Sequence, residues 1–340
     1  MVTTPNPSPP NVNDVQTSPL APSALEGCAT FSIHGQDQQS LPLVVVSPHS
    51  GRFYPPSMVA ESRLSPQELM QSEDALVDQL IAPIAWQGGV LIQSEIARAY
   101  LDLNRDASEL DASMFQELSN ATDTWRSPRV AAGLGVIPRL VTQNTPIYDQ
   151  PLPASEVDRR IGRVYHPFHA ALAELVDQTV ARFGRCLVID CHSMPPLPGV
   201  KLAGSRSATA RLQTSGGLDI VLGDRMGQSC QPWLSEHISE VFSGAGLLVE
   251  RNRPFAGGNI TQRFAQSQGL SPAIQSLQVE ISRKLYLTLP DDAQTSRQPN
   301  PQFYMVRQIL CDSLIALAQR FANARGNEGP IAIDPPLAAE

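Results

Sequence analysis

The stretch LVVVSPHSG, residues 43–51, decides the fold, and CLVIDCHS, residues 186–193, is its counterpart. Each begins as a short apolar, β-branched run, which is typical of a strand buried on both faces of a sheet. Each run leads directly into a histidine, His49 or His192. Ligands of open α/β sheets bind at the carboxyl ends of the strands. We therefore expect both imidazoles at one rim of the same sheet.

Outward from these two runs, strand-like segments alternate with longer segments of helical period. This pattern predicts an α/β fold with a mixed central sheet flanked by helices. Further strands are predicted at residues 90–93, 99–103, 219–222, 246–250 and 277–281, and helices at residues 65–85, 155–183, 224–242 and 302–321. Ser65-Pro66-x-Glu68 is a capping box, so a helix should begin there. Residues 106–154 carry few such signals and should form a long, functional excursion over the sheet.

The composition is that of an ordinary globular protein, because 42% of the 340 residues are apolar and 17% are charged. No apolar run approaches the ~20 residues that cross a bilayer, and the N-terminus lacks a signal-peptide pattern. A net charge of -8 argues against nucleic acid as a partner. Five scattered cysteines without a CxxC pair indicate neither disulfides nor a thiolate zinc cluster, and a cytoplasmic location is expected.

The chain ends differ in composition from its middle. Residues 1–24 are rich in Pro, Ser, Thr and Asn and predict a disordered tail, and residues 326–340 predict a flexible one. A single catalytic domain is expected at residues 25–325.

Two histidines at equivalent strand ends favour a metal site over two independent strand caps. Neutral imidazole is a good zinc ligand, and a catalytic zinc keeps three protein ligands and one open position. The third ligand should be a nearby carboxylate, and both Glu73 and Asp74 follow His49 closely enough to supply it.

Glu280 lies inside the apolar run at residues 277–281. A carboxylate there is costly unless it is paired, bound to a metal or functional. Beside a metal-activated water it would make a general base. An internal ion pair with Arg283 or Lys284 is an equally good interpretation.

Polar residues interrupt the predicted strand in ARAYLDLNRD, residues 97–106. Asn104 and Arg105 suit the amide and carboxylate groups of a small substrate. Arg98 and Asp102 are better explained as a buried pair. Gly257-Gly258 would let backbone approach a ligand closely, although a plain loop explains these glycines equally well.

Two further histidines fall on the predicted helix at residues 155–183. His166 and His169 are spaced i, i+3, but no glutamate completes a zincin motif. We expect His169 to be a core histidine or one that supports the site, and His166 to be exposed. Cys191, next to His192, should point to the opposite face of its strand.

Eight motifs in order across residues 40–290 resemble the N-formylglutamate amidohydrolase family. They are SPHSG (47–51), SEDALVDQL (72–80), ARAYLDLNRD (97–106), GVIPR (135–139), YHPFHAAL (165–172), IDCHSMP (189–195), FAGGNITQRF (255–264) and LQVEISRKLYL (277–287). The resemblance implies a zinc-hydrolase fold similar to that of carboxypeptidases, aspartoacylases and cell-wall amidases.

The resemblance also assigns roles to residues. It implies His49, Asp74 and His192 as metal ligands, with Glu73 the alternate for Asp74, and Glu280 as the catalytic base. Asn104-Arg105 and Gly257-Gly258 match substrate-binding segments. The sequence departs from the family pattern at Asn259 and at Gln262-Arg263, and this departure concerns the acyl substrate.

We therefore expect zinc-dependent hydrolysis of the amide bond of a small N-acyl amino acid, with N-formyl-L-glutamate giving formate and L-glutamate. Arg105, helped by Arg98 or Arg283, would hold substrate carboxylates. The alternatives are another amide hydrolase of the same fold, acting on an acyl-aspartate or a peptidoglycan stem, and a non-catalytic protein that binds small acids.

Overall fold

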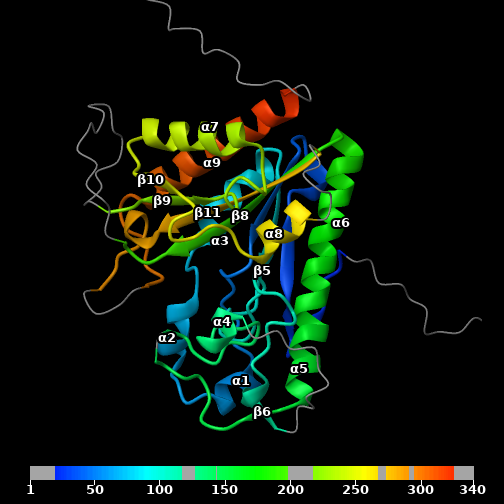
Figure 1. The fold of residues 1–340 in the computed structure, drawn as a ribbon, viewed down its shortest axis with the longest axis vertical. Coiled ribbons are helices and arrows are strands. Elements are labelled where there is room, and N and C mark those ends of the chain that lie inside the picture. Colours follow the sequence, from blue (N-terminus) through cyan, green and yellow to red (C-terminus); the bar gives the residue numbers. More distant parts are fainter. Residues whose placement is uncertain are drawn as a thin grey trace, which may run out of the picture.

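A computed structural model describes residues 20–116, 127–142, 144–197, 217–266, 273–290 and 295–324. The predicted tails therefore lie outside the described residues, except for residues 20–24. A seven-stranded mixed sheet forms the centre of the structure (Figure 1), as predicted. Its strand order is β10 (Val249–Arg251), β9 (Ile220–Gly223), β11 (Ile274–Ser282), β8 (Cys186–Met194), β4 (Leu43–Ser47), β5 (Val90–Ser94), β3 (Phe31–His34). Strands β11, β8, β4 and β5 run parallel, whereas β9 and β3 run antiparallel to their neighbours β11 and β5.

Helices cover both faces of the sheet. One apolar cluster joins α3 (Val77–Ile81), α7 (Pro232–Gly244) and α9 (Phe303–Asn323) to one face. A second cluster joins α6 (His166–Phe183) and α8 (Asn259–Gln266) to the other. Leu43 and Val45 belong to the first cluster and Val44 and Val46 to the second, as period-2 alternation requires. The run at residues 43–47 is thus a strand buried on both faces, as its composition predicts.

Shorter elements are set around this core, and Figure 1 shows α1, α2, α4 and β6 gathered at one end of the molecule. Among the described residues, no helix is both long and apolar enough to cross a bilayer. The short elements are β1 (Ala24–Leu25), β2 (Cys28–Ala29), η1 (Gln36–Gln38), α1 (Pro56–Glu61), α2 (Pro66–Leu69), η2 (Met70–Ser72), η3 (Ala82–Trp86), η4 (Ala112–Met114), β6 (Phe115–Gln116), α4 (Pro128–Ala131), β7 (Leu152–Pro153), α5 (Ser155–Arg160), η5 (Ile161–Tyr165) and η6 (Arg283–Leu285).

The predicted strand at residues 99–103 is wrong, because this segment forms turns. The amide of Tyr100 donates to the carbonyl of Ala97 at 2.9 Å, and the amide of Asn104 donates to the Asp102 carboxylate at 2.9 Å. Short polar side chains that bond nearby backbone compete with sheet pairing. Strand alternation therefore does not describe the polar residues of this segment.

The predicted helix at residues 65–85 begins at its capping box but is interrupted. Helix α2 continues into the short 3-10 turn η2, and α3 starts only at Val77, after Leu76 in the left-handed region at φ 61°. In the break, the amide of Asp74 donates to the carbonyl of His49 at 3.0 Å. The interruption thus ties Asp74 to the end of β4.

The remaining predictions hold with shifted ends. Residues 155–183 form a nearly continuous helix through α5, η5 and α6, and residues 302–321 correspond to α9. Helix α7 begins at Pro232 rather than at residue 224, because Asp224 turns the chain by accepting from the amide of Gly227 at 2.9 Å. The strand predicted at 246–250 is β10, whereas β3 and α8 have no counterpart among the predicted elements.

Candidate active site

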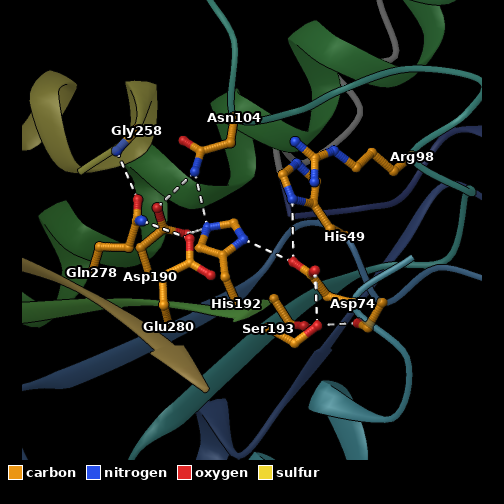
Figure 2. A network of polar contacts seen from close by, with 12 residues as sticks. His49, Asp74, Arg98, Asn104, Asp190, His192, Ser193, Gly258, Gln278 and Glu280 are labelled. Atoms are coloured by element: carbon orange, nitrogen blue, oxygen red, sulfur yellow. Dashed lines mark hydrogen bonds and ion pairs between the residues drawn. The ribbon is translucent and has the colours of Figure 1, made fainter. Parts of the chain in front are cut away.

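Three side chains from distant parts of the chain converge on one point. His49 follows β4, His192 lies within β8, and Asp74 comes from the break before α3. The Oδ2 atom of Asp74 lies 2.9 Å from Nδ1 of His192 and 3.3 Å from Nδ1 of His49. All three residues are buried, and each offers one ligand atom within 4.8 Å of the others (Figure 2). Both imidazoles therefore lie at one rim of the sheet, as their positions at strand ends predict.

A carboxylate holds each imidazole from its far side. The Nε2 atom of His49 bonds Asp102 Oδ1 at 2.7 Å, and the Nε2 atom of His192 bonds Asp190 Oδ1 at 2.8 Å. A histidine that donates through one ring nitrogen to a carboxylate keeps the other nitrogen as a lone-pair donor for a metal. Both Nδ1 atoms are thereby directed at Asp74.

The arrangement fits a divalent cation. The buried Nδ1 atom of His49 has no hydrogen-bond partner among the described residues. A bound cation would occupy the lone pair of this nitrogen. Burial alone would raise the pKa of Asp74, but its hydrogen bond with His192 and the nearby imidazole of His49 hold it well below its usual range. Two imidazole nitrogens and one carboxylate oxygen form the donor set of a catalytic zinc site with an open position.

The structure selects Asp74 over Glu73 as the acidic member of this group. The Glu73 carboxylate accepts from the Tyr54 hydroxyl and pairs with Arg297, whose Nε lies 3.0 Å from Glu73 Oε2. Asp74 uses Oδ1 to accept from the Ser193 hydroxyl at 3.0 Å, which leaves Oδ2 for the histidines.

Glu280 stands beside the cluster on β11, directly opposite His192 on β8. It lines the cavity at the rim, and burial raises its pKa to about 8. The side-chain amide of Gln278 donates to Glu280 Oε1 at 2.9 Å, and the amide of Gly258 donates to Gln278 Oε1 at 2.7 Å (Figure 2). Arg283 and Lys284 were the ion-pair partners considered for Glu280, and both lie against other acids. Lys284 Nζ is 3.1 Å from Asp219, and Arg283 is 3.5 Å from Asp74.

Asn104 and the two glycines form a packed support. The Asn104 amide donates to Asp190 Oδ2 at 2.9 Å and accepts from the amide of Ile260 at 2.8 Å. A Cβ on Gly258 would lie 2.3 Å from Asn104 Nδ2, and Gly257 adopts φ 119°. The glycines do allow a close approach, but the groups nearest to them are protein side chains, Asn104 beside Gly258 and Arg225 beside Gly257. Both glycines also line the cavity.

The three predicted substrate-binding arginines all line this cavity, which has a volume of about 670 Å³. Arg98 pairs with Asp102 at 2.9 Å, which confirms that pair. Arg283 donates to the Ser193 hydroxyl at 2.9 Å and to the carbonyl of Glu73 at 2.7 Å. Arg105 donates through Nε to the carbonyl of Leu134 at 3.0 Å.

Sequence reasoning missed four residues of the site. Three of them were not singled out at all: Asp190, Gln278 and the cavity residue Arg129. Asp102 was predicted only as the ion-pair partner of Arg98, and its hydrogen bond with His49 was not predicted. Asp190 carries a signal that would have found it: it lies two residues before His192 in an apolar strand, and so on the same face.

The other candidates have structural places. Cys191 packs in the core cluster on the opposite face, where burial raises its thiol pKa far above the usual range. His169 is buried with Nε2 at 2.9 Å from the carbonyl of Leu103, and His166 is exposed. A cysteine nucleophile at this site is thus excluded.

Known proteins share this sequence and architecture. Residues 41–287 match the family model described as N-formylglutamate amidohydrolase. The chain is 24% identical over 250 residues to the N-formylglutamate deformylase of Pseudomonas aeruginosa, covering 73% of this chain and 82% of that protein. It is similar to the crystal structure of N-formylglutamate amidohydrolase from Ralstonia eutropha JMP134, with 32% identity, a TM-score of 0.74 and coverage of 86% of this chain and 99% of the other.

A gene product of Agrobacterium tumefaciens shares the fold, with 17% identity, a TM-score of 0.58 and coverage of 86% of this chain and 94% of that one. The family match spans well over half of the chain and includes all residues of the cluster. The chain belongs to the N-formylglutamate amidohydrolase family.

Proposed function

We propose that this chain is a zinc-dependent amidohydrolase that cleaves N-formyl-L-glutamate to formate and L-glutamate. The observation that carries the proposal is the convergence of His49, Asp74 and His192 beside Glu280 in one cavity. Family membership supports amide hydrolysis as the reaction, and the names of the relatives from Pseudomonas aeruginosa and Ralstonia eutropha support the substrate.

His49, Asp74 and His192 would hold the metal through Nδ1, Oδ2 and Nδ1. When bound there, a zinc ion supplies Lewis-acid polarisation of the acyl carbonyl and activates water. Asp102 and Asp190 keep the two imidazoles in the tautomer that faces the metal. These carboxylates also fix the ring orientations, so the ligand geometry is set before substrate enters.

Glu280 is the proposed general base. It accepts a proton from the attacking water at its carboxylate and passes that proton to the departing amide nitrogen, which leaves as the amine. A base works best when its pKa lies near the working pH, and burial places that of Glu280 at about 8. Gln278 fixes the carboxylate by donating to one oxygen, Oε1.

The arginines divide into two roles. Arg283, held against Asp74 and Ser193, positions the metal ligand. Arg98 and Arg105 are the proposed contacts for substrate carboxylate, since both residues line the cavity and guanidinium groups recognise carboxylates. Asn104 supports Asp190 rather than contacting substrate.

The cavity volume favours a second candidate. About 670 Å³ is within the range that accommodates drug-sized ligands, and N-formylglutamate is smaller than these. An amide hydrolase acting on a larger acyl amino acid is therefore the alternative. A panel of N-formyl, N-acetyl and N-succinyl amino acids, assayed for release of free amine, separates the two.

The variant Glu280→Gln tests the mechanism. It removes the base but no metal ligand, so we expect unchanged metal content and a rate lower by a factor of about 10² to 10⁴. Metal analysis and turnover are measured on the same samples, with Glu236→Gln on the exposed surface of α7 as the matched control.

Full turnover by Glu280→Gln would refute the base assignment. Wild-type protein without stoichiometric metal, together with a His49→Ala variant that still binds the same small acid, would instead identify a non-catalytic binding protein.

A further inference from the structure

The turn segment at residues 97–106 is connected to both imidazoles of the site. Its Asp102 carboxylate bonds His49 at 2.7 Å. Its Asn104 side chain donates at 2.9 Å to Asp190, the carboxylate behind the other imidazole. A shift of this segment would therefore move the groups that hold both histidines.

The long helix at residues 155–183 grips this segment by its backbone carbonyls. Three buried side chains of the helix donate to them, and the contacts are Arg160 Nη1 to Tyr100 at 3.0 Å, Tyr165 Oη to Arg105 at 2.9 Å and His169 Nε2 to Leu103 at 2.9 Å. Because a carbonyl only accepts, the His169 ring carries a proton on Nε2. These contacts satisfy polar backbone groups that the turns do not pair with a strand, and so they fix the segment against the helix.

The three side chains face the same segment because the helix contains a π turn, η5, at Ile161–Tyr165. In an uninterrupted α-helix, residues five apart point about 140° apart, so Arg160 and Tyr165 would face different directions. In the π turn, the amide of His166 bonds to the carbonyl five residues earlier, and residues at this spacing come into line. His169 follows Tyr165 by one α-helical turn, and their ring centroids are 4.2 Å apart.

Pro167 accounts for the position of the π turn. Proline has no amide to donate, and its ring clashes with the carbonyl four residues earlier in an α-helix, here that of Arg163. The carbonyl of Arg163 accepts instead from the Ser23 hydroxyl. Turns of this kind are rare and occur frequently at functional sites.

Asn259, at the start of α8, fixes the Tyr165 hydroxyl from a second side. Its side-chain amide donates to the carbonyl of Arg105 at 2.8 Å and to the Tyr165 hydroxyl at 3.1 Å. The hydroxyl therefore accepts from α8 while it donates to the turn segment. Tyr165 thus joins the long helix, α8 and the segment at one point.

We propose that Tyr165 and His169 are positioning residues of the proposed metal site, and that the π turn sets their register relative to Arg160. They act through the backbone of residues 97–106 on the carboxylates that hold both imidazoles. The inference rests on the proposed function, because a metal must bind between these imidazoles for their positions to matter.

The variants Tyr165→Phe and His169→Leu each remove one donor while keeping an apolar side chain of similar size. We expect each to lower zinc affinity about threefold to tenfold, because returning the segment to its metal-binding position then costs about as much as the lost hydrogen bond. His169→Gln retains an amide donor and should stay within about twofold of wild type. Tyr304→Phe, at an exposed position of α9, is the matched control for Tyr165→Phe. Competition with a chromophoric chelator measures the affinities.

Deletion of Gly162 tests the π turn itself. Without this residue an α-helical turn is favoured, which takes Tyr165 out of line with Arg160. Gly162→Ala is the matched control, since Gly162 is exposed and a Cβ there would meet no atom of the described residues within 4 Å. We expect the deletion, but not the control, to lower zinc affinity and to change the absorption spectrum of the Co²⁺-substituted protein. If the deletion variant does not fold, Tyr165→Phe and His169→Leu decide the proposal.

Thermal unfolding of the metal-free proteins separates positioning from a purely structural role. A helix that only stabilises the fold would lower the unfolding temperature of Tyr165→Phe and His169→Leu and leave zinc affinity and the Co²⁺ spectrum unchanged. That result would overturn the proposal. If wild type binds zinc but cleaves no formyl amino acid, the proposed function fails, and the zinc affinities still decide the roles of Tyr165 and His169. A wild type that binds no zinc would overturn both.

Discussion

The two imidazoles of the site are held by carboxylates outside the His49, Asp74 and His192 group. Asp190 holds His192 at 2.8 Å and Asp102 holds His49 at 2.7 Å, each through Nε2. Such partners orient the ring, fix its tautomer and increase the basicity of the ligand nitrogen. The geometry of the proposed metal site therefore extends one layer beyond His49, Asp74 and His192.

Replacing Asp190 with Asn should weaken metal binding while leaving the fold intact, because the side chain keeps its size but loses its charge. We expect metal affinity to fall by a factor of about 10 to 100. Competition with a chromophoric chelator measures this, with Asp177→Asn on the exposed face of α6 as control. Equal affinities in the three proteins would mean that Asp190 does not support His192.

At the residue scale, residue types predicted most of the side chains that converge at the site, but not which of two neighbouring acids joins the histidines. Two histidines at strand ends and a glutamate in an apolar strand were sufficient signals for His49, His192 and Glu280. Glu73 does not join the two histidines because it pairs with Arg297, which lies 224 residues later in sequence. No local pattern reports such a distant partner.

Buried strands were predictable as elements because their apolar runs are continuous. The segments around Asp74 and Asp102 were not, because their structure follows from hydrogen bonds that periodicity does not report. The amide of Asp74 donates to the carbonyl of His49, and the Asp102 carboxylate accepts from the amide of Asn104. A helical period across residues 65–85 hides the break at Asp74, and a strand-like period across 99–103 hides turns. Both errors fall on segments that carry residues of the candidate site, where the contacts of that site override local propensity.

Helix α6 carries a histidine that should make stability depend on pH. Burial, and then the charge of Arg263, lowers the pKa of His169 to about 3, whereas an unfolded histidine titrates near about 6.5. Between these values the unfolded chain binds the extra proton. The free energy of unfolding should therefore fall as pH decreases through this window, by up to about 1.4 kcal/mol per pH unit from this residue.

Urea denaturation between pH 6.5 and 4.5 measures the effect. The variant His169→Gln should show a shallower loss of stability with acid than wild type, and His166→Gln, at an exposed position of the same helix, should match wild type. The same acid dependence in both variants would show that His169 is not the group responsible.

At the scale of the molecule, the site exists because the sheet brings distant segments together. Strand β8 lies between β4 and β11, so residues 49, 192 and 280 meet across neighbouring strands. The sequence predicts a mixed sheet from its alternating periods, but the strand order joins elements far apart in the chain and leaves no local signal. The excursion at residues 106–154 was expected to be functional, and its described part forms a wall of the cavity.

Anomalous diffraction at the zinc absorption edge, from crystals of the full chain grown with zinc, tests the central claim most directly. We expect one strong peak within about 2.0 to 2.3 Å of Nδ1 of His49, Oδ2 of Asp74 and Nδ1 of His192. A zinc-loaded crystal with no peak between these three atoms, or with its zinc bound elsewhere on the chain, would contradict it.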